Sequence, residues 1–225
     1  MSVLHFAVLL PFLFAVFVPL FYKFLRNIHT GWFVLIVPLL LFVYFASYYP
    51  IINPEDTIYR SVPWIPMFGI HYSIHLDSLA LLFTFIITGI GALVVLYSIF
   101  YMSKEREALH NFYIYLLSFM GAMLGVVLTD NLIVLYTFWE ITSISSFLLI
   151  AYWYQRKRSR YGAMKALLIT VIGGFAMLLG FLLLYTASGS FSIREIVANI
   201  GQVSSHVLFV PAMLLVLLGA FTKSA

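Results

Sequence analysis

The chain has 225 residues, of which 64% are hydrophobic and 9% are charged, with a mean hydropathy of +1.07 and a formal net charge of +4. Soluble domains carry roughly 25% charged residues, so this composition excludes an ordinary soluble domain, and the high hydrophobicity excludes a disordered chain. The basic residues lie in short gaps between apolar runs, which argues against nucleic-acid binding and indicates the orientation of a membrane protein.

Seven apolar stretches are long enough to cross a bilayer as helices. A hydrocarbon core of about 30 Å requires roughly 20 residues of α-helix. In chain order the stretches are residues 3–22, 32–49, 79–102, 112–128, 131–154, 166–187 and 208–225. We therefore predict an all-α membrane protein, a polytopic bundle of about seven transmembrane helices whose first segment is a membrane span rather than a cleaved signal peptide.

The basic residues in the gaps set the predicted orientation. Only Arg60 and Arg194 fall on one side of the membrane, and Lys223 lies inside an apolar run. The positive-inside rule places the other, richer side in the cytoplasm, which makes the N-terminus extracytoplasmic. The residues on the cytoplasmic side are Lys23, Arg26, Lys104, Arg106, Arg156, Lys157, Arg158, Arg160 and Lys165.

The longest polar stretch, residues 50–77, is predicted to be extracytoplasmic. Alternating apolar residues at 70–76 favour a short strand or hairpin. His71 and His75 are four residues apart, a spacing that suits either a metal-binding pair or two solvent-exposed loop residues, and no third ligand lies at zinc-site spacing. Asp77 and Asp130 each precede an apolar run and are predicted N-caps of the third and fifth segments.

Glu140 is an acidic residue that cannot leave the hydrocarbon. It lies roughly 14 Å into its segment, too deep for a short carboxylate to reach the interface. Thr137 and Ser143 flank it on the same helical face, where their hydroxyls could hydrogen-bond the carboxyl or order water beside it. We expect Glu140 to face other helices or a wet cavity with a partner; a structural interhelical hydrogen bond is the alternative.

Lys223 is the basic candidate partner for Glu140. Straight helices would leave the two side chains offset by about 8–9 Å, so a tilt, a broken helix or water would have to join them; alternatively, Lys223 extends toward the cytoplasmic interface. A buried pair of this kind can gate protons, because forming it favours both charged forms and opening it favours release of the lysine proton. Lys165 is a third candidate, or simply an orientation charge.

The sequence shows no enzyme or cofactor signature. It has no cysteine, no phosphate-binding loop, no nucleophile elbow and no pair of intramembrane histidines that could hold a haem. Small residues, Gly173, Gly174 and Gly180, lie in the sixth apolar stretch and predict close helix packing. We expect neither a catalytic residue nor a bound cofactor or metal.

An ordered set of short motifs resembles the antiporter-like membrane subunits of respiratory complex I and related antiporters. The motifs are 76–79 (LDSL), 88–91 (TGIG), 130–134 (DNLIV), 138–140 (FWE), 146–150 (SFLLI), 164–166 (MKA) and 219–225 (GAFTKSA). Two further segments, 139–143 (WEITS) and 158–165 (RSRYGAMK), are most similar to the A-subunits of Mrp-type multisubunit Na+/H+ antiporters. Complex I large subunits usually carry an Asp after the glycine in the sixth helix, whereas this sequence has Gly-Gly-Phe at residues 173–175.

The resemblance implies a fold and a set of roles. The chain would be an N-terminal portion of a fourteen-helix protein: residues 1–110 hold helices one to three with the extracytoplasmic loop 50–77, and residues 111–225 begin the first five-helix repeat. Glu140 would form a switching pair with Lys223 of a broken seventh helix, and Lys165 would tune that pair during proton translocation.

The function implied by the resemblance is cation/proton antiport across the bacterial cytoplasmic membrane. The expected partners are other subunits of an Mrp-type complex, protons, Na+ and membrane lipid, without nucleic acid. One alternative is a proton-pumping membrane subunit of an NADH:quinone oxidoreductase or a membrane-bound hydrogenase. Another is a non-transporting scaffold, in which the charged residues serve assembly alone.

Overall fold

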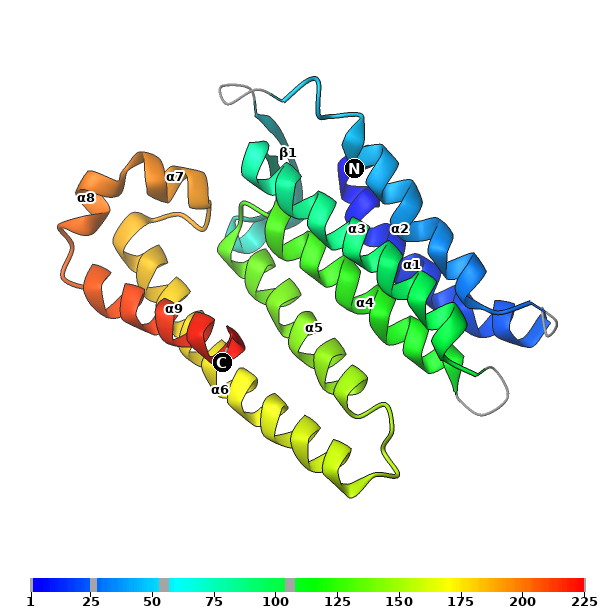
Figure 1. The fold of residues 1–225 in the computed structure, drawn as a ribbon. Coiled ribbons are helices and arrows are strands. Elements are labelled where there is room, and N and C mark those ends of the chain that lie inside the picture. The colour runs from blue at the N-terminus through cyan, green and yellow to red at the C-terminus, as the bar shows by residue number, and fades with distance from the viewer. Residues whose placement is uncertain (1, 25–27, 53–56, 104–107, 225) are drawn as a thin grey trace. The chain divides into compact units, whose positions relative to one another are not determined.

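A computed structural model of the chain describes residues 2–24, 28–52, 57–103 and 108–224, and it is mostly helical (Figure 1). Arg26, Lys104 and Arg106, which contribute to the predicted orientation, lie outside the described residues, as does Ala225.

Within the described residues, five helices are long and apolar enough to span a membrane: α1 (Val3–Phe24), α3 (Ser78–Tyr101), α4 (Leu109–Leu128), α5 (Leu132–Ile150) and α6 (Lys157–Ser188). Two further apolar helices, α2 (Gly31–Ala46) and α9 (Phe209–Ser224), are shorter. Each predicted apolar stretch is therefore a helix, and the chain is a multi-pass membrane protein.

The helices extend beyond the predicted apolar stretches where neighbouring polar residues are also helical. Helix α6 begins at Lys157, nine residues before the predicted start at 166, because apolarity marks the part of a helix that fits the hydrocarbon and not its charged first turns. The polar gap before α9 contains two short helices, α7 (Ile193–Ala198) and α8 (Ile200–Ser204), which the hydropathy pattern did not indicate.

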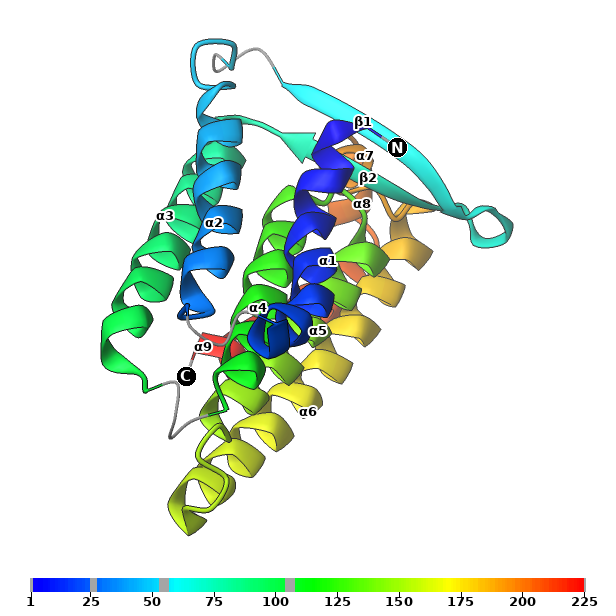
Figure 2. The same ribbon diagram turned by 90° about the vertical axis from the view of Figure 1, so that its right-hand side faces the viewer.

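The predicted strand at 70–76 is confirmed. It is β2 (Ile70–Leu76), which pairs with β1 (Ile58–Ile65) in a two-stranded sheet that Figure 2 shows as a long hairpin. A 3-10 turn, η1 (Pro66–Phe68), joins the strands and ends at Gly69, whose φ of 65° is a left-handed conformation that glycine adopts without strain.

Both histidines of the possible metal pair lie on β2. His71 is exposed and His75 is half-buried. In the part of the chain that the structure describes, no group of three His, Cys, Asp or Glu residues could hold a metal ion. The residue that follows the strand, Asp77, caps α3 as predicted, since its carboxylate accepts a hydrogen bond of 2.7 Å from the Ala80 amide.

One compact unit comprises residues 1–60 and 74–128. In it α1 packs against α4, α2 packs against α3, and α3 also contacts α4, as Figure 2 shows from one side. A hydrogen bond of 2.9 Å between the hydroxyls of Ser98 and Tyr113 joins α3 to α4 in a buried position. A polar side chain inside an apolar bundle is thus paired, as hydrocarbon surroundings demand.

The second compact unit comprises residues 61–73 and 129–225. Helix α6 packs against α5 and α9, while α7 and α8 connect the C-terminal end of α6 to α9 (Figure 1). Seven of its buried apolar residues form a cluster near α7 and α8: Leu132, Met177, Phe181, Leu184, Ile196, Val203 and Ala212.

The predicted cap of α5 is wrong by one residue. Asn131, and not Asp130, accepts hydrogen bonds from the amides of Ile133 (3.0 Å) and Val134 (3.3 Å). The Asp130 carboxylate instead accepts from the Ser192 hydroxyl (2.8 Å) and the Arg194 amide (3.0 Å) at the start of α7. Either residue type can cap a helix, so only the tertiary contact with α7 distinguishes their roles.

Asp130 is accordingly expected to stabilise the second unit. Asp130 is itself buried, and replacing it with Ala removes the acceptor of two part-buried hydrogen bonds, which should cost about 1–3 kcal/mol of stability. Asp130→Asn, which keeps one carbonyl oxygen, should lose less. Size-exclusion chromatography of the detergent-solubilised protein after heating measures the midpoint of each variant, and equal midpoints for wild type and Asp130→Ala would contradict the assignment.

Candidate functional site

Glu140 lies within α5 and points toward α6. A Cβ built on Gly174 of α6 would lie 3.2 Å from the Glu140 carboxyl carbon and would collide with Oε1. The carboxyl therefore occupies the space that a side chain at Gly174 would fill. Oε1 is buried, and among the described residues it has no hydrogen-bond partner.

Lys223 extends from α9 to a single turn of α5. Its Nζ donates to the Trp139 carbonyl (3.2 Å), the Thr142 hydroxyl (2.5 Å) and the Ser143 hydroxyl (2.7 Å). Nζ also lies 5.0 Å from the centroid of a Trp139 ring, within range of a cation–π interaction. Three acceptors match the three donors of an ammonium group, so this turn of α5 satisfies Lys223 in its charged form.

The two predicted residues, Glu140 and Lys223, thus meet at the same part of α5 but are not joined. Within the described residues, Lys223 bonds to neighbours of Glu140 along α5 and forms no direct ion pair with the carboxylate. The side chain of Lys223 is half-buried, and its Nζ is bonded to α5.

The expected direct hydrogen bonds from the flanking hydroxyls to the Glu140 carboxyl are not formed within the described residues. Thr137 donates to the Ile133 carbonyl at 2.9 Å, and Ser143 donates to the Trp139 carbonyl at 3.2 Å. Helical Ser and Thr commonly bond the carbonyl one turn earlier, which satisfies them within their own helix. The spacing to Glu140 therefore does not decide where the hydroxyl hydrogen goes.

Thr142 is the site residue that sequence reasoning missed. Being two residues from Glu140, it does not share the Glu140 face of the helix. It does share a face with Trp139 and Ser143, at spacings of i, i+3 and i+4. That spacing of polar groups around Trp139 is the signal that could have identified it.

Three glycines bring α9 into backbone contact with α6 and so position Lys223. A Cβ on Gly219 would lie 2.7 Å from the Gly173 carbonyl oxygen, and one on Gly180 would lie 2.8 Å from the Ala212 carbonyl oxygen. A Cβ on Gly173 would collide with the Thr222 side chain, next to Lys223. The close packing predicted from small residues in this stretch is confirmed.

Lys165 lies apart from this arrangement. It is exposed on α6, about two turns before Gly173. In the portion of the chain that is described, its side chain has no hydrogen-bond or ion-pair partner. The structure therefore brings Glu140 and Lys223 to one site and leaves the role of Lys165 as a prediction.

A cavity of about 280 Å³ adjoins Lys223 between α5 and α6. Four hydroxyl side chains line it together with the ammonium, and the rest of its wall is apolar; the hydroxyls belong to Ser143, Ser146, Thr170 and Thr222. A cavity of this size with several polar groups has room and partners for water.

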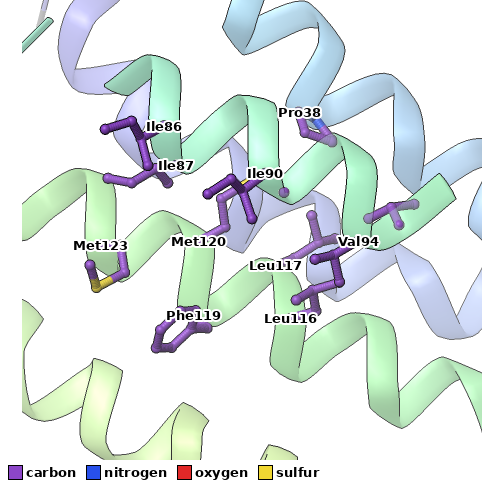
Figure 3. A pocket seen from close by; sticks show the side chains of 12 residues that line it. Pro38, Ile86, Ile87, Ile90, Val94, Leu116, Leu117, Phe119, Met120 and Met123 are labelled. Carbon is purple, nitrogen blue, oxygen red and sulfur yellow. The ribbon is translucent and has the colours of Figure 1, made fainter. Parts of the chain in front are cut away.

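A second cavity, of about 230 Å³, lies in the other unit and differs in chemistry. Apolar side chains of α3 and α4, together with Pro38 of α2, line it (Figure 3). Ile90 and Met120 are typical of its wall. Apolar cavities of this kind stay dry, so the polar cavity beside Lys223 is the one suited to protons or water.

Comparison with protein families gives two matches in chain order. Residues 64–113 match the model described as the N-terminus of chain 5 of NADH-ubiquinone oxidoreductase (complex I). Residues 129–225, which include Glu140 and Lys223, match the model described as the transmembrane region of NADH:quinone oxidoreductase and Mrp antiporters.

Individual relatives agree over the whole chain. The A-subunit of the Na+/H+ antiporter of Alkalihalophilus pseudofirmus is 60% identical over 225 residues, and that of Bacillus subtilis is 59% identical, each match covering 100% of this chain. The chain spans 28% of the length of each of these relatives.

Solved structures show the same fold. The Mrp complex from Dietzia sp. DQ12-45-1b superposes with a TM-score of 0.86 at 31% identity, over 100% of this chain and 24% of the other. Respiratory complex I from Thermus thermophilus superposes with a TM-score of 0.75 at 21% identity, over 96% of this chain and 43% of the other. The two family models identify the chain as related to the membrane subunits that Mrp antiporters share with NADH:quinone oxidoreductase, and over its whole length the chain is similar to part of the A-subunit of Na+/H+ antiporters.

Proposed function

We propose that the chain is part of a cation/proton antiporter of the bacterial cytoplasmic membrane, in which Glu140 and Lys223 take part in proton translocation. The observation that carries this proposal is the pair of opposite charges inside apolar helices. One has a buried oxygen without a hydrogen-bond partner among the described residues, and the other is held by neutral oxygens. A charge at the bilayer centre costs at least about 2.5–3.5 kcal/mol and is usually retained for function. The names of the relatives support Na+ and H+ as the exchanged ions.

The proposal includes a membrane topology. Helices α2 and α9 also cross the membrane, which gives seven spans, with the N-terminus outside and the loop between α5 and α6 in the cytoplasm. That loop carries Arg156, whose guanidinium carbon lies 4.9 Å from the Trp153 ring centroid. Tryptophan and basic residues gather at the cytoplasmic interface of membrane proteins.

The remaining parts of the proposal concern the complete protein. The chain forms the first part of a fourteen-helix fold, with residues 1–110 preceding a five-helix repeat that begins in residues 111–225. Further subunits, protons, Na+ and lipid are its partners. Lys165 lies on α6 about two turns before Gly173. From there its positive charge acts electrostatically on the Glu140–Lys223 pair.

Glu140→Gln is expected to abolish antiport, because an amide keeps the size of the carboxyl but cannot exchange a proton. Everted vesicles that contain the complete antiporter complex, assayed by a pH-sensitive dye after Na+ addition, should give the signal of vesicles without the complex. The exposed residue Glu195 offers a matched control, and Glu195→Gln should keep wild-type antiport.

The same vesicles separate the alternatives. Wild-type antiport by Glu140→Gln would contradict the assigned role, and loss of antiport together with loss of assembly would favour the scaffold alternative. Acidification driven by an electron donor such as NADH, instead of by Na+, would favour a redox-driven pump.

The orientation is tested with two matched cysteine variants of a chain that has no cysteine of its own. Gln155 precedes α6 and Gln202 follows it in α8, and both are exposed. The 32 residues of α6 extend about 48 Å, enough to cross the membrane. In intact cells a membrane-impermeant maleimide should label Gln202→Cys and not Gln155→Cys; the reverse pattern would invert the topology.

A further inference from the structure

We infer that Thr142 and Ser143 form a second docking position for the Lys223 ammonium, which competes with Glu140 for it. The inference rests on the proposed function, since it deepens the role of the Glu140–Lys223 pair. Thr142 and Ser143 are positioning residues: they hold Lys223 in a defined place when it is not paired with the carboxylate.

The hydroxyls are arranged as acceptors for a cation. Thr142 donates its own hydrogen to the Trp139 carbonyl at 2.6 Å, and Ser143 donates to the same carbonyl at 3.2 Å. Each oxygen therefore presents lone pairs to Nζ of Lys223, at 2.5 and 2.7 Å. Thr142 is 1% exposed and Ser143 is 2% exposed, so both acceptors lie inside the protein.

The carboxylate is left separate while Lys223 occupies this position. Oε1 of Glu140 is buried against Gly174 and lacks a hydrogen-bond partner within the described residues. The Glu140 carboxylate and the hydroxyls of Thr142 and Ser143 lie at neighbouring positions of α5. Lys223 therefore changes partner by rotating its own side chain, while the contacts of Gly180 and Gly219 keep α9 against α6.

The docking position borders the polar cavity. Ser143 and Lys223 both line the cavity of about 280 Å³, and Ser146 and Thr170 extend its polar surface. With Lys223 on the hydroxyls, its ammonium lies beside a space that accommodates water. The second docking position thus separates the two charges without leaving the ammonium unpartnered.

The test removes the two acceptors in the complete antiporter complex. Thr142→Val keeps the branched shape and Ser143→Ala keeps the small size, while both lose the hydroxyl. The double variant should lose antiport by about tenfold or more, as expected when a charged group loses hydrogen bonds. Thr142→Ser and Ser143→Thr retain the hydroxyl and should restore most of the activity, which a purely structural role would not require.

Thr186→Val is the matched control. Thr186 also donates to carbonyls of its own helix, those of Leu182 and Leu183, but it lies on an exposed part of α6. It should keep wild-type antiport. Assembly of each variant is checked by co-purification of the complex, so that a folding defect is recognised.

The outcomes distinguish the inference from the proposed function. Wild-type antiport by Glu140→Gln in parallel vesicles overturns the proposed function, and the inference with it. Loss of antiport by Glu140→Gln, together with wild-type antiport by the double variant, overturns the second docking position alone. If the double variant does not assemble, Ser143→Ala is measured instead: a partial loss restored by Ser143→Thr supports the docking position, and unchanged antiport contradicts it.

Discussion

The backbone contact between α6 and α9 is the interaction on which the arrangement of the charged groups depends. Hydrocarbon offers no hydrophobic force between apolar helices, so close packing of small residues has to hold them together. Gly180 contacts the backbone of α9 at Ala212, Gly219 of α9 contacts the backbone of α6 at Gly173, and Gly173 also makes room for Thr222. With α9 held so closely, Lys223 reaches a turn of α5 that a more distant helix would not allow it to reach.

Much of this arrangement could be predicted from the sequence because hydrocarbon permits few solutions. Apolar length alone indicates helices, and the alternation at 70–76 indicates a strand. A charged residue within an apolar run is costly to bury and is therefore a candidate functional residue. This is why Glu140 and Lys223 could be selected as candidate site residues from their positions in apolar runs. The close packing of the sixth apolar stretch follows in the same way from its glycines.

What the sequence could not provide are the choices between chemically equal partners. Asp130 and Asn131 are both good caps, and only the contact with α7 assigns one to α5. Thr142 and Ser143 are ordinary helical hydroxyls until α9 places an ammonium beside them. Helices α7 and α8 are too short and too polar to give a hydropathy signal, so their existence depends on packing. Helix α8 contacts α6 and α9, and Ile196 of α7 belongs to the buried apolar cluster.

A second docking position also solves an energetic problem of any buried switch. Separating a buried ion pair costs about 3–5 kcal/mol when a charge is left without a partner. A hydrogen bond to a charged group contributes about 1.5–3 kcal/mol, so the hydroxyls of Thr142 and Ser143 offset most of that cost. The paired and separated states of Lys223 then differ by a few kcal/mol at most, which is the range in which both states are populated. A more polar second site would stabilise the separated state so strongly that Lys223 would stay there. An apolar second site would not stabilise the separated state, and Lys223 would stay paired with Glu140.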